Sequence, residues 1–417
     1  MNAKTDIIER CLKCGLCVEQ CPILSGFIGG ADPAILVTDI IDMLSGGPCT
    51  RKVRELIWTC MGCGQCRQWC PEKIAPDIFA VARRELLRRG SAPTAMLQQW
   101  LPDSPYHFGR LISALVLDGK PPWLSNPAPM DVTKDIVVYL GCYVLAVPEI
   151  AITLLRLIEQ MGMSAVALGG DGLCCGAGYL LNGKYELAQK ARQYSAELIK
   201  SYRPRTVVFE CASCHAFISP LLTGLESFHH VDFLFRNLSR IKLSDRGKKT
   251  ITYHDSCDPR RGVTGDYETP RRLLSSLPGI TLTEMEHNRQ NSICCGGLAN
   301  TTNHLATEKL RTERLKEAAA TGAEMIVTTC RSCYGAMVGF DKGLPRVTHD
   351  ILLVGQYAGI TVPEYFRSLI SNSDFSSVLT RARGQFGKCG LNGDTAVASI
   401  TGFIERHRPS SHQKQHL

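Results

Sequence analysis

The sequence contains no long uninterrupted apolar run. A membrane-spanning helix needs roughly 18 such residues, and the best candidate, residues 146–158, is broken by Pro148, Glu149 and Arg156. The N-terminus also lacks a basic start followed by an apolar stretch, so we expect neither an export signal nor a transmembrane segment. The expected location is the reducing cytoplasm, with any peripheral attachment to the cytoplasmic membrane made through a partner.

Signatures of nucleic-acid and nucleotide binding are missing as well. The formal net charge is +8, but the chain has no zinc-finger spacing, RNA-binding signature or basic tail, so we expect no nucleic-acid partner. We interpret the basic excess, which includes doublets such as Arg260-Arg261, mainly as compensation for the negative charge that metal-bound cysteine thiolates would carry. We also interpret it as a docking surface. No G-x-G-x-x-G opens a βα unit, and Gly178-x4-Gly183-Lys184 lacks the Ser or Thr of a phosphate loop. Neither a nicotinamide nor a flavin is therefore expected on this chain.

Cysteine is abundant instead, with 20 among 417 residues. Apolar residues make up 44% and charged residues 21%, as in ordinary globular proteins that need no disulfide staples. In a long chain without an export signal, this many cysteines indicates metal or redox sites rather than crosslinks.

Two cysteine motifs near the N-terminus share the spacing C-x2-C-x2-C-x3-C-P. Soft thiolates favour iron–sulfur cores, and the fourth cysteine of such a motif binds the neighbouring cluster. We therefore expect two cubane [4Fe-4S] clusters, one held by Cys11, Cys14, Cys17 and Cys70 and the other by Cys60, Cys63, Cys66 and Cys21. Structural zinc is the alternative, but it explains neither the third cysteine nor the x3-Cys-Pro ending.

The segments around these motifs predict helices over 34–44, 51–58 and 76–89, the last on apolar spacing. We therefore expect residues 1–90 to form a helical ferredoxin domain that binds two clusters. Residues 91–132 are interrupted by seven prolines and are expected to be a connector with one helix near 108–117.

An internal repeat follows. Its cysteine spacings are C-x31-CC-x35-C-x2-C and C-x36-CC-x34-C-x2-C. In the first copy we expect strands at 135–140 and 206–209 and a helix at 184–201; in the second, strands at 250–253 and 325–328 and a helix at 302–320. The expected α/β domains span residues 133–245 and 246–365, ahead of a C-terminal extension and tail over 366–417. The overall fold class is α+β.

Each copy offers five thiols, one more than a cubane needs. The adjacent pairs Cys174-Cys175 and Cys294-Cys295 are awkward for one cubane, since neighbouring side chains point differently. A larger or opened iron–sulfur assembly is therefore expected. A zinc site or a disulfide-stapled α/β domain is the alternative, opposed by the reducing compartment and the ligand excess.

The doubled pattern resembles the cysteine-rich CCG domain family of heterodisulfide reductases. Residues 5–360 as a whole are similar to the D-type subunit of that enzyme, and to the iron–sulfur subunits of glycolate oxidase and anaerobic glycerol-3-phosphate dehydrogenase. The resemblance implies two non-cubane [4Fe-4S] clusters. Their ligand sets would be Cys142, Cys174, Cys175, Cys211 and Cys214, and Cys257, Cys294, Cys295, Cys330 and Cys333. One departure is that Asp258 follows Cys257 where the family often has histidine.

The resemblance implies an oxidoreductase, or a subunit of one, in which the cubanes feed the CCG-bound clusters for disulfide reduction. The candidate catalytic region is the second cluster. Alternatively, the chain is the electron-transfer subunit of an FAD-dependent 2-hydroxy acid or glycerol-3-phosphate dehydrogenase that passes electrons to quinone. The implied partner is a flavoprotein or a cytochrome b-type redox subunit. A structural or redox-sensing module ranks last, because eighteen placed ligands exceed its needs.

Several residues carry weaker signals. His215 and His254 stand beside candidate ligands and could donate to sulfur, although ordinary packing is the commoner role of such histidines. His229-His230 and His349-Asp350 are expected in strand-to-helix turns. Cys49 and Cys389 fit no ligand set and receive no role.

Overall fold

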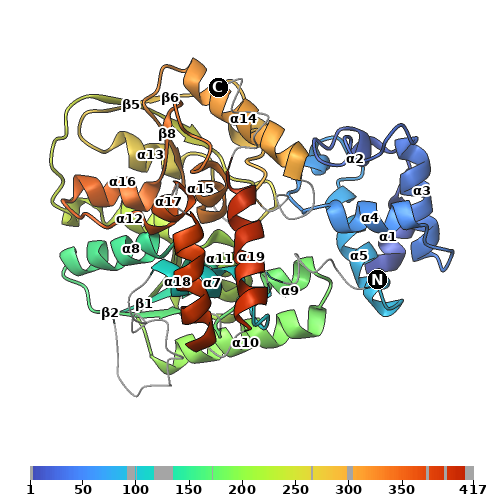
Figure 1. The fold of residues 1–417 in the computed structure, drawn as a ribbon, viewed down its shortest axis with the longest axis horizontal. Coiled ribbons are helices and arrows are strands. Elements are labelled where there is room, and N and C mark those ends of the chain that lie inside the picture. Colours follow the sequence, from blue (N-terminus) through green and yellow to red (C-terminus); the bar gives the residue numbers. More distant parts are fainter. Residues whose placement is uncertain are drawn as a thin grey trace.

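The structure is a computed structural model that describes residues 3–91, 99, 101–116, 135–170, 172–263, 266–297, 304–371, 375–388 and 392–408. Figure 1 shows a small helical N-terminal part to one side of two α/β parts. Most of the expected proline-rich connector, Cys389 and the tail from 409 onward lie outside the described residues.

The N-terminal part is helical, as the sequence predicts. Its helices are α1 (Ala3–Arg10), α2 (Leu16–Glu19), α3 (Pro33–Leu44), α4 (Arg51–Thr59) and α5 (Ala75–Arg88). The start of α3 is set by Asp32, whose carboxylate accepts from the Ala34 N–H at 2.7 Å, and by proline at the first position. Thr50 caps α4 in the same way. The apolar faces of α3, α4 and α5 share one core.

Each cysteine-rich repeat contains a four-stranded parallel sheet. The first sheet has the order β2-β1-β3-β4 and the second the order β6-β5-β7-β8, so the two copies have the same topology. The bounds in the first copy are β1 (Ile136–Gly141), α8 (Pro148–Gln160), β2 (Ala165–Gly169), α9 (Ala177–Leu181), α10 (Tyr185–Ser201), β3 (Thr206–Phe209), α11 (Ala212–Ile218), β4 (Glu226–His229) and α12 (His230–Arg236).

The second copy repeats this order, with one helix fewer among the described residues. It comprises β5 (Lys249–His254), α13 (Thr269–Ser275), β6 (Ile280–Thr283), α14 (His304–Ala320), β7 (Met325–Thr328), α15 (Arg331–Met337), β8 (Arg346–His349) and α16 (Asp350–Tyr357). The predicted strands and long helices of both copies are confirmed to within about two residues. The expected turns also hold, since β4 ends at His229 and α12 begins at His230, while β8 ends at His349 and α16 begins at Asp350.

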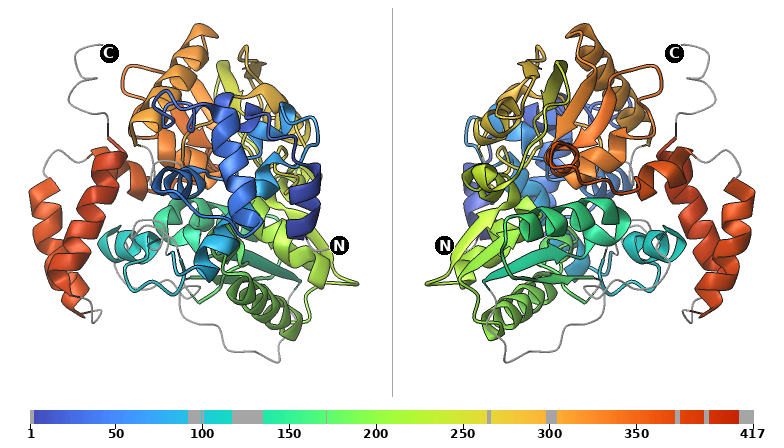
Figure 2. Two further views of the ribbon diagram at one scale, coloured as in Figure 1. Left: turned by 90° about the vertical axis from the view of Figure 1, so that its right-hand side faces the viewer. Right: turned by 90° about the vertical axis from the view of Figure 1, so that its left-hand side faces the viewer.

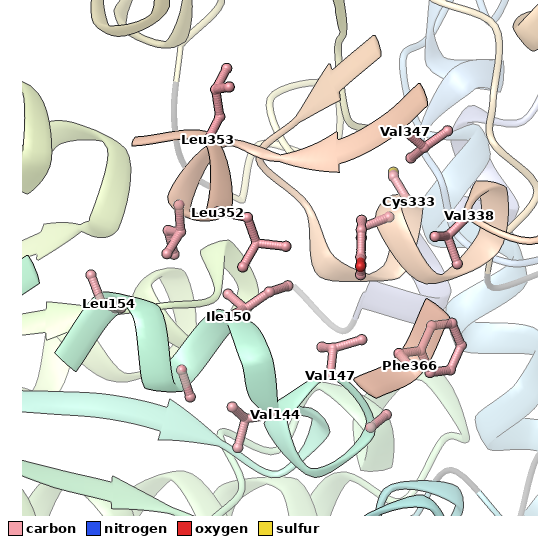
Figure 3. Close-up of a cluster of buried hydrophobic side chains, with 14 of the residues drawn as sticks. Val144, Val147, Ile150, Leu154, Cys333, Val338, Val347, Leu352, Leu353 and Phe366 are labelled. Atoms are coloured by element: carbon pink, nitrogen blue, oxygen red, sulfur yellow. The ribbon is translucent and has the colours of Figure 1, made fainter. Parts of the chain in front are cut away.

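The two repeats share one hydrophobic core. Helix α8 of the first packs against α16 of the second, and Figure 3 shows Val147 and Ile150 facing Leu352 across this boundary. The 146–158 segment, the longest apolar run, thus lies largely in α8 and is buried by the second repeat. None of the described helices has the length and apolarity required to span a membrane.

The C-terminal region is more structured than the expected extension and tail. Residues 365–406 contain α17 (Tyr365–Ser371), α18 (Phe375–Lys388) and α19 (Gly393–Arg406). The last two pack on α7 (Phe108–Val116), the predicted connector helix, with the rings of Phe108 and Phe403 4.6 Å apart. Figure 2 shows these red helices along one flank, beside α7. Their few apolar residues are spread among Ser, Thr and Gly, and their partner helix α7 lies almost 300 residues away in the sequence. The local sequence therefore has no pattern that predicts this packing.

Candidate iron–sulfur centres

The first N-terminal motif forms a small concave site. Its lining includes Cys11, Cys14, Cys17 and Cys70, so Cys70 of the second motif joins three thiols of the first. Gly15 makes the close turn possible: its φ is +76°, and a Cβ there would lie 2.5 Å from the Ala34 nitrogen. Burial, followed by the neighbouring thiols Cys11 and Cys70, raises the pKa of Cys17 to about 12.

The second motif gathers the complementary set. Cys21 lies close enough to Cys63 and Cys60 for their charges to interact, and Cys66 interacts with the same three. Burial raises the pKa of Cys21 to about 12, with repulsion from Cys63 adding to it. Backbone N–H groups point at these sulfurs, from Leu24 to Cys21 at 3.5 Å and from Gly62 to Cys60 at 3.4 Å.

These two thiol sets fit iron–sulfur clusters on the chemistry of their donors. Four crowded thiols, most of them partly buried, are costly as thiolates unless a metal core shares their charge. N–H donors aimed at sulfur are typical of cluster ligands. Arg83, 4% exposed, adds positive charge beside Cys60, and its Nη2 has no hydrogen-bond partner among the described residues.

The five thiols of the first repeat come from three strand or helix ends. Cys142 follows β1, the pair Cys174-Cys175 precedes α9, and Cys211 and Cys214 lie at the start of α11. Cys174 lies close enough to Cys142 and Cys175, and Cys214 to Cys175 and Cys211, for their thiols to interact. All five therefore form one continuous sulfur cluster.

The second repeat repeats this arrangement. Cys295 and Cys333 Sγ are 3.1 Å apart. The thiols of Cys294 and Cys295 lie close enough to interact, as do those of Cys330 and Cys333. Cys257 interacts with Cys330 through its charge. The second set of five thiols is therefore also continuous.

A glycine after each cysteine pair is sterically required. Gly176 and Gly296 have φ of +89° and +72°, and a Cβ would lie 2.4 Å from the Ala188 carbonyl oxygen or 2.8 Å from Thr307 Cβ. Their N–H groups donate to Cys174 and Cys294 Sγ at 3.2 and 3.3 Å. The Cys-Cys-Gly sequence therefore holds the pair in place and supplies a sulfur hydrogen bond.

Both repeats open into one cavity of about 180 Å³. Its lining includes all ten repeat cysteines and also Cys63 of the N-terminal part. Cys63 interacts through its charge with Cys257 and Cys294, and Gly64 lies against the backbone of Arg260, whose carbonyl oxygen would be 3.0 Å from a Cβ. The N-terminal part therefore meets the second repeat at the cavity wall.

Buried arginines line or approach this cavity. The composition of the chain did not predict their position there. Arg261 is coupled electrostatically to Cys257 and Cys63, while Arg331, from the second repeat, is coupled to Cys211 and Cys214 of the first. Arg331 donates to the Leu140 carbonyl at 3.0 Å and pairs with the buried Glu210. The sequence feature that could have pointed to Arg331 is its position directly after the candidate ligand Cys330.

The expected docking role of the arginine doublets is wrong in part. Arg261 is held beside Cys257, and Arg271 is 5% exposed and pairs with Asp255 at 2.8 Å. These side chains balance charge inside the protein. Their position agrees with the other part of the interpretation, in which basic side chains compensate negative charge.

The two candidate histidines differ in their surroundings. His254 is buried, and a ring nitrogen lies with Cys295 and Cys333 Sγ in a group whose atoms are all within 4.8 Å. His215 instead packs its ring against Phe209 and faces Ser227 Oγ at 3.5 Å. Cys49 donates to the Thr50 carbonyl at 3.6 Å and is absent from the linings of the cysteine sites.

Comparison with known proteins agrees with this arrangement. The 4Fe-4S dicluster domain family matches residues 7–74, and the cysteine-rich CCG domain family matches residues 136–219 and 251–338. The chain is thus an iron–sulfur oxidoreductase built from one dicluster domain and two CCG domains. More particularly, it is similar over most of its length to the D-type subunits of heterodisulfide reductase.

Three relatives illustrate the range. The chain is 27% identical over 397 residues to the D-type subunit of the dihydromethanophenazine:CoB–CoM heterodisulfide reductase of Methanosarcina acetivorans, covering 85% of this chain and 95% of that one. It is 23% identical to the B-type subunit of the fumarate reductase (CoM/CoB) of Methanothermobacter marburgensis, over 79% and 67% of the two chains. It is also 23% identical to the EtfAB:quinone oxidoreductase of Syntrophomonas wolfei, over 78% and 54%.

The fold also has a solved counterpart. A hypothetical protein from Helicobacter pylori superposes with a TM-score of 0.51 at 9% identity, covering 89% of this chain and 75% of that one. At that identity the match supports the fold alone.

Proposed function

We propose that this protein relays electrons through two cubane [4Fe-4S] clusters to two non-cubane clusters that reduce a disulfide in the shared cavity. The ligand sets are those proposed from the sequence: Cys11, Cys14, Cys17 and Cys70; Cys60, Cys63, Cys66 and Cys21; and the five cysteines of each repeat. The observation that carries the proposal is the cavity bounded by ten repeat cysteines and by Cys63.

The exposure of the cysteines supports this order of the relay. Cys14 is exposed, whereas the paired cysteines and Cys214 and Cys333 are buried or nearly so. Leu12 and Ile35, near this first site, are 61% and 60% exposed, which is unusual for large apolar side chains. Electron-transfer partners use small interfaces of this kind. Electrons therefore enter at the first cubane, pass to the Cys63 site and reach the second repeat.

The cavity suits a disulfide. Bound clusters would supply electrons and an iron site for a substrate sulfur. Reduction of one disulfide consumes two electrons and two protons and yields two thiols. The protein's own contribution is a largely apolar pocket that limits water, together with Arg261 and Arg331, whose charges favour thiolate within it.

A second candidate function uses the same relay without chemistry in the cavity. The similarity to an EtfAB:quinone oxidoreductase supports an electron-transfer subunit that works with an FAD-dependent dehydrogenase and passes electrons to quinone. In that case the partner is a flavoprotein, whereas disulfide reduction calls for a cytochrome b-type or similar electron donor.

The deciding experiment uses anaerobically purified full-length protein. We expect about sixteen irons per chain, and we expect the reduced protein to be reoxidised by a suitable disulfide with release of two thiols per disulfide. Thiol release is followed chemically and cluster oxidation by paramagnetic resonance. Full iron content with no reoxidation by any disulfide, but rapid reoxidation by quinone with a flavoprotein partner present, would establish the second function. Iron-free folded protein would reject both.

A further inference from the structure

The two repeats differ at one matched pair of positions beside their cysteines. His254 lies three residues before Cys257, and Tyr139 lies three before Cys142. The partner of His254 is Arg314, and the partner of Tyr139 is Ser195; each stands sixteen residues before the first cysteine of the C-x2-C motif. The contrast is therefore built into equivalent places of one fold.

In the second repeat, Arg314 holds the imidazole in one tautomer. Arg314 Nε donates to His254 Nδ1 at 2.9 Å. A guanidinium has no acceptor, so Nδ1 must accept and the ring proton resides on Nε2. Arg314 is itself fixed, since its Nη1 donates to the His287 carbonyl and to Glu317 Oε2, both at 2.7 Å.

The fixed imidazole lies against the sulfurs. A ring nitrogen of His254 lies within 4.8 Å of the Sγ atoms of Cys295 and Cys333, and all three residues are buried. Because Nδ1 accepts from Arg314, the ring carries its single proton on Nε2. A neutral ring with its proton on Nε2 is a hydrogen-bond donor to sulfur.

In the first repeat, the corresponding groups make hydrogen bonds to each other and to the backbone. Tyr139 and Ser195 share a hydrogen bond of 2.9 Å, and Ser195 Oγ also donates to the Cys174 carbonyl at 3.1 Å. The hydroxyls are used by each other and by the backbone. Within the part of the chain that the structure describes, no guanidinium donates to either hydroxyl as Arg314 donates to His254.

We propose that His254 is a positioning residue that, held by Arg314, donates its Nε2–H to Cys295 and makes the second-repeat centre easier to reduce than the first. The physical reason is that hydrogen bonds to cluster sulfur stabilise the more negative, reduced state. The second repeat is also the one beside Cys63, so the easier-to-reduce centre is the one that first receives electrons. The inference rests on the cluster ligands given under the proposed function.

The direct test needs no change at the histidine. Protein labelled with ring-¹⁵N histidine is reduced anaerobically and examined by pulsed paramagnetic resonance. We expect a weak ¹⁵N coupling in the second-repeat signal, identified by its loss in Cys294→Ser, and none in the first-repeat signal, identified by its loss in Cys174→Ser. A second-repeat signal without ¹⁵N coupling overturns the inference. If neither signal can be found, the cluster assignment of the proposed function fails instead.

A redox titration supplies the energetic test. His254→Leu should lower the midpoint potential of the second-repeat signal alone, and His254→Gln, whose amide can accept from Arg314 and donate to sulfur, should restore most of it. Tyr139→Phe is the matched control and should leave the second-repeat potential unchanged. Equal shifts of both signals, or no shift in a fully iron-loaded His254→Leu protein, would contradict the proposal. If His254→Leu loses iron, the ¹⁵N result decides.

Discussion

The two cysteine-rich repeats have the same ligand pattern and sheet order but different surroundings. The first has neutral Tyr139 and Ser195 beside its cysteines. Ala212 follows the first cysteine of its C-x2-C motif. The second has His254 and Arg314 at the matching places, and Arg331 in place of Ala212. Arg331 then reaches into the first repeat. The sulfur ligands are thus common to both copies, whereas the charges that serve both sites belong to the second.

The largest expected effect separates the two sites by removing one ligand from each. Because buried thiols of one repeat interact mainly with one another, Cys294→Ser should abolish one unusual paramagnetic signal and about four irons, and Cys174→Ser should abolish the other. Both should leave the cubane signals intact. Cys49→Ser is the matched control, with iron content and spectra unchanged. Loss of all signals in either ligand variant would show that the sites are not separate.

The second-largest effect is expected from breaking the ion pair between Arg331 and Glu210, which joins the repeats. Arg331→Met leaves Glu210, 1% exposed, as an uncompensated buried charge. We expect a loss of about 3–5 kcal/mol in the free energy of unfolding, measured by denaturant titration. The double variant Arg331→Met with Glu210→Gln should recover most of that loss. Equal stability of the single and double variants would mean that the pair does not join the repeats.

A buried carboxyl group gives the contact between the repeats a pH dependence. Glu149 of α8 accepts from Tyr334 Oη at 3.3 Å and from the Phe366 N–H at 3.2 Å, and burial raises its pKa to about 8. A raised folded-state pKa stabilises the fold below the unfolded value, and this contribution is lost as pH rises through about 8. Glu149→Gln should therefore gain stability relative to the original protein as pH rises from about 4.5 to about 8, by a few kcal/mol at most, with a constant difference above that range. Thermal unfolding across that range measures the difference, and a constant difference would contradict the assignment.

The smallest effect contrasts the first N-terminal cysteine site, where Cys14 is exposed, with the more buried cysteines of the repeats. Leu12→Ser with Ile35→Ser should leave the melting temperature within about 2 °C, because exposed apolar side chains contribute little to folding. Reduction by a redox partner should slow several-fold, while reduction by a small chemical reductant should not change. Exposed Leu187→Ser on α10, distant in sequence from the first motif, is the control. Equal slowing in that control would argue against this face as the docking site.

The amino-acid sequence by itself determined the local chemistry. The cysteine spacing, the glycine after each cysteine pair and the duplication are present in the sequence itself. Most strands and helices could be predicted, because each depends on residues within a few turns of one another. Only the tertiary structure decided that ten repeat cysteines and Cys63 meet at one cavity. It also decided that Arg331 serves the opposite repeat, that Arg314 orients His254, and that α18 and α19 cover α7. These contacts join segments 60 to almost 300 residues apart, and their energy comes from burial and charge pairing that no single segment contains.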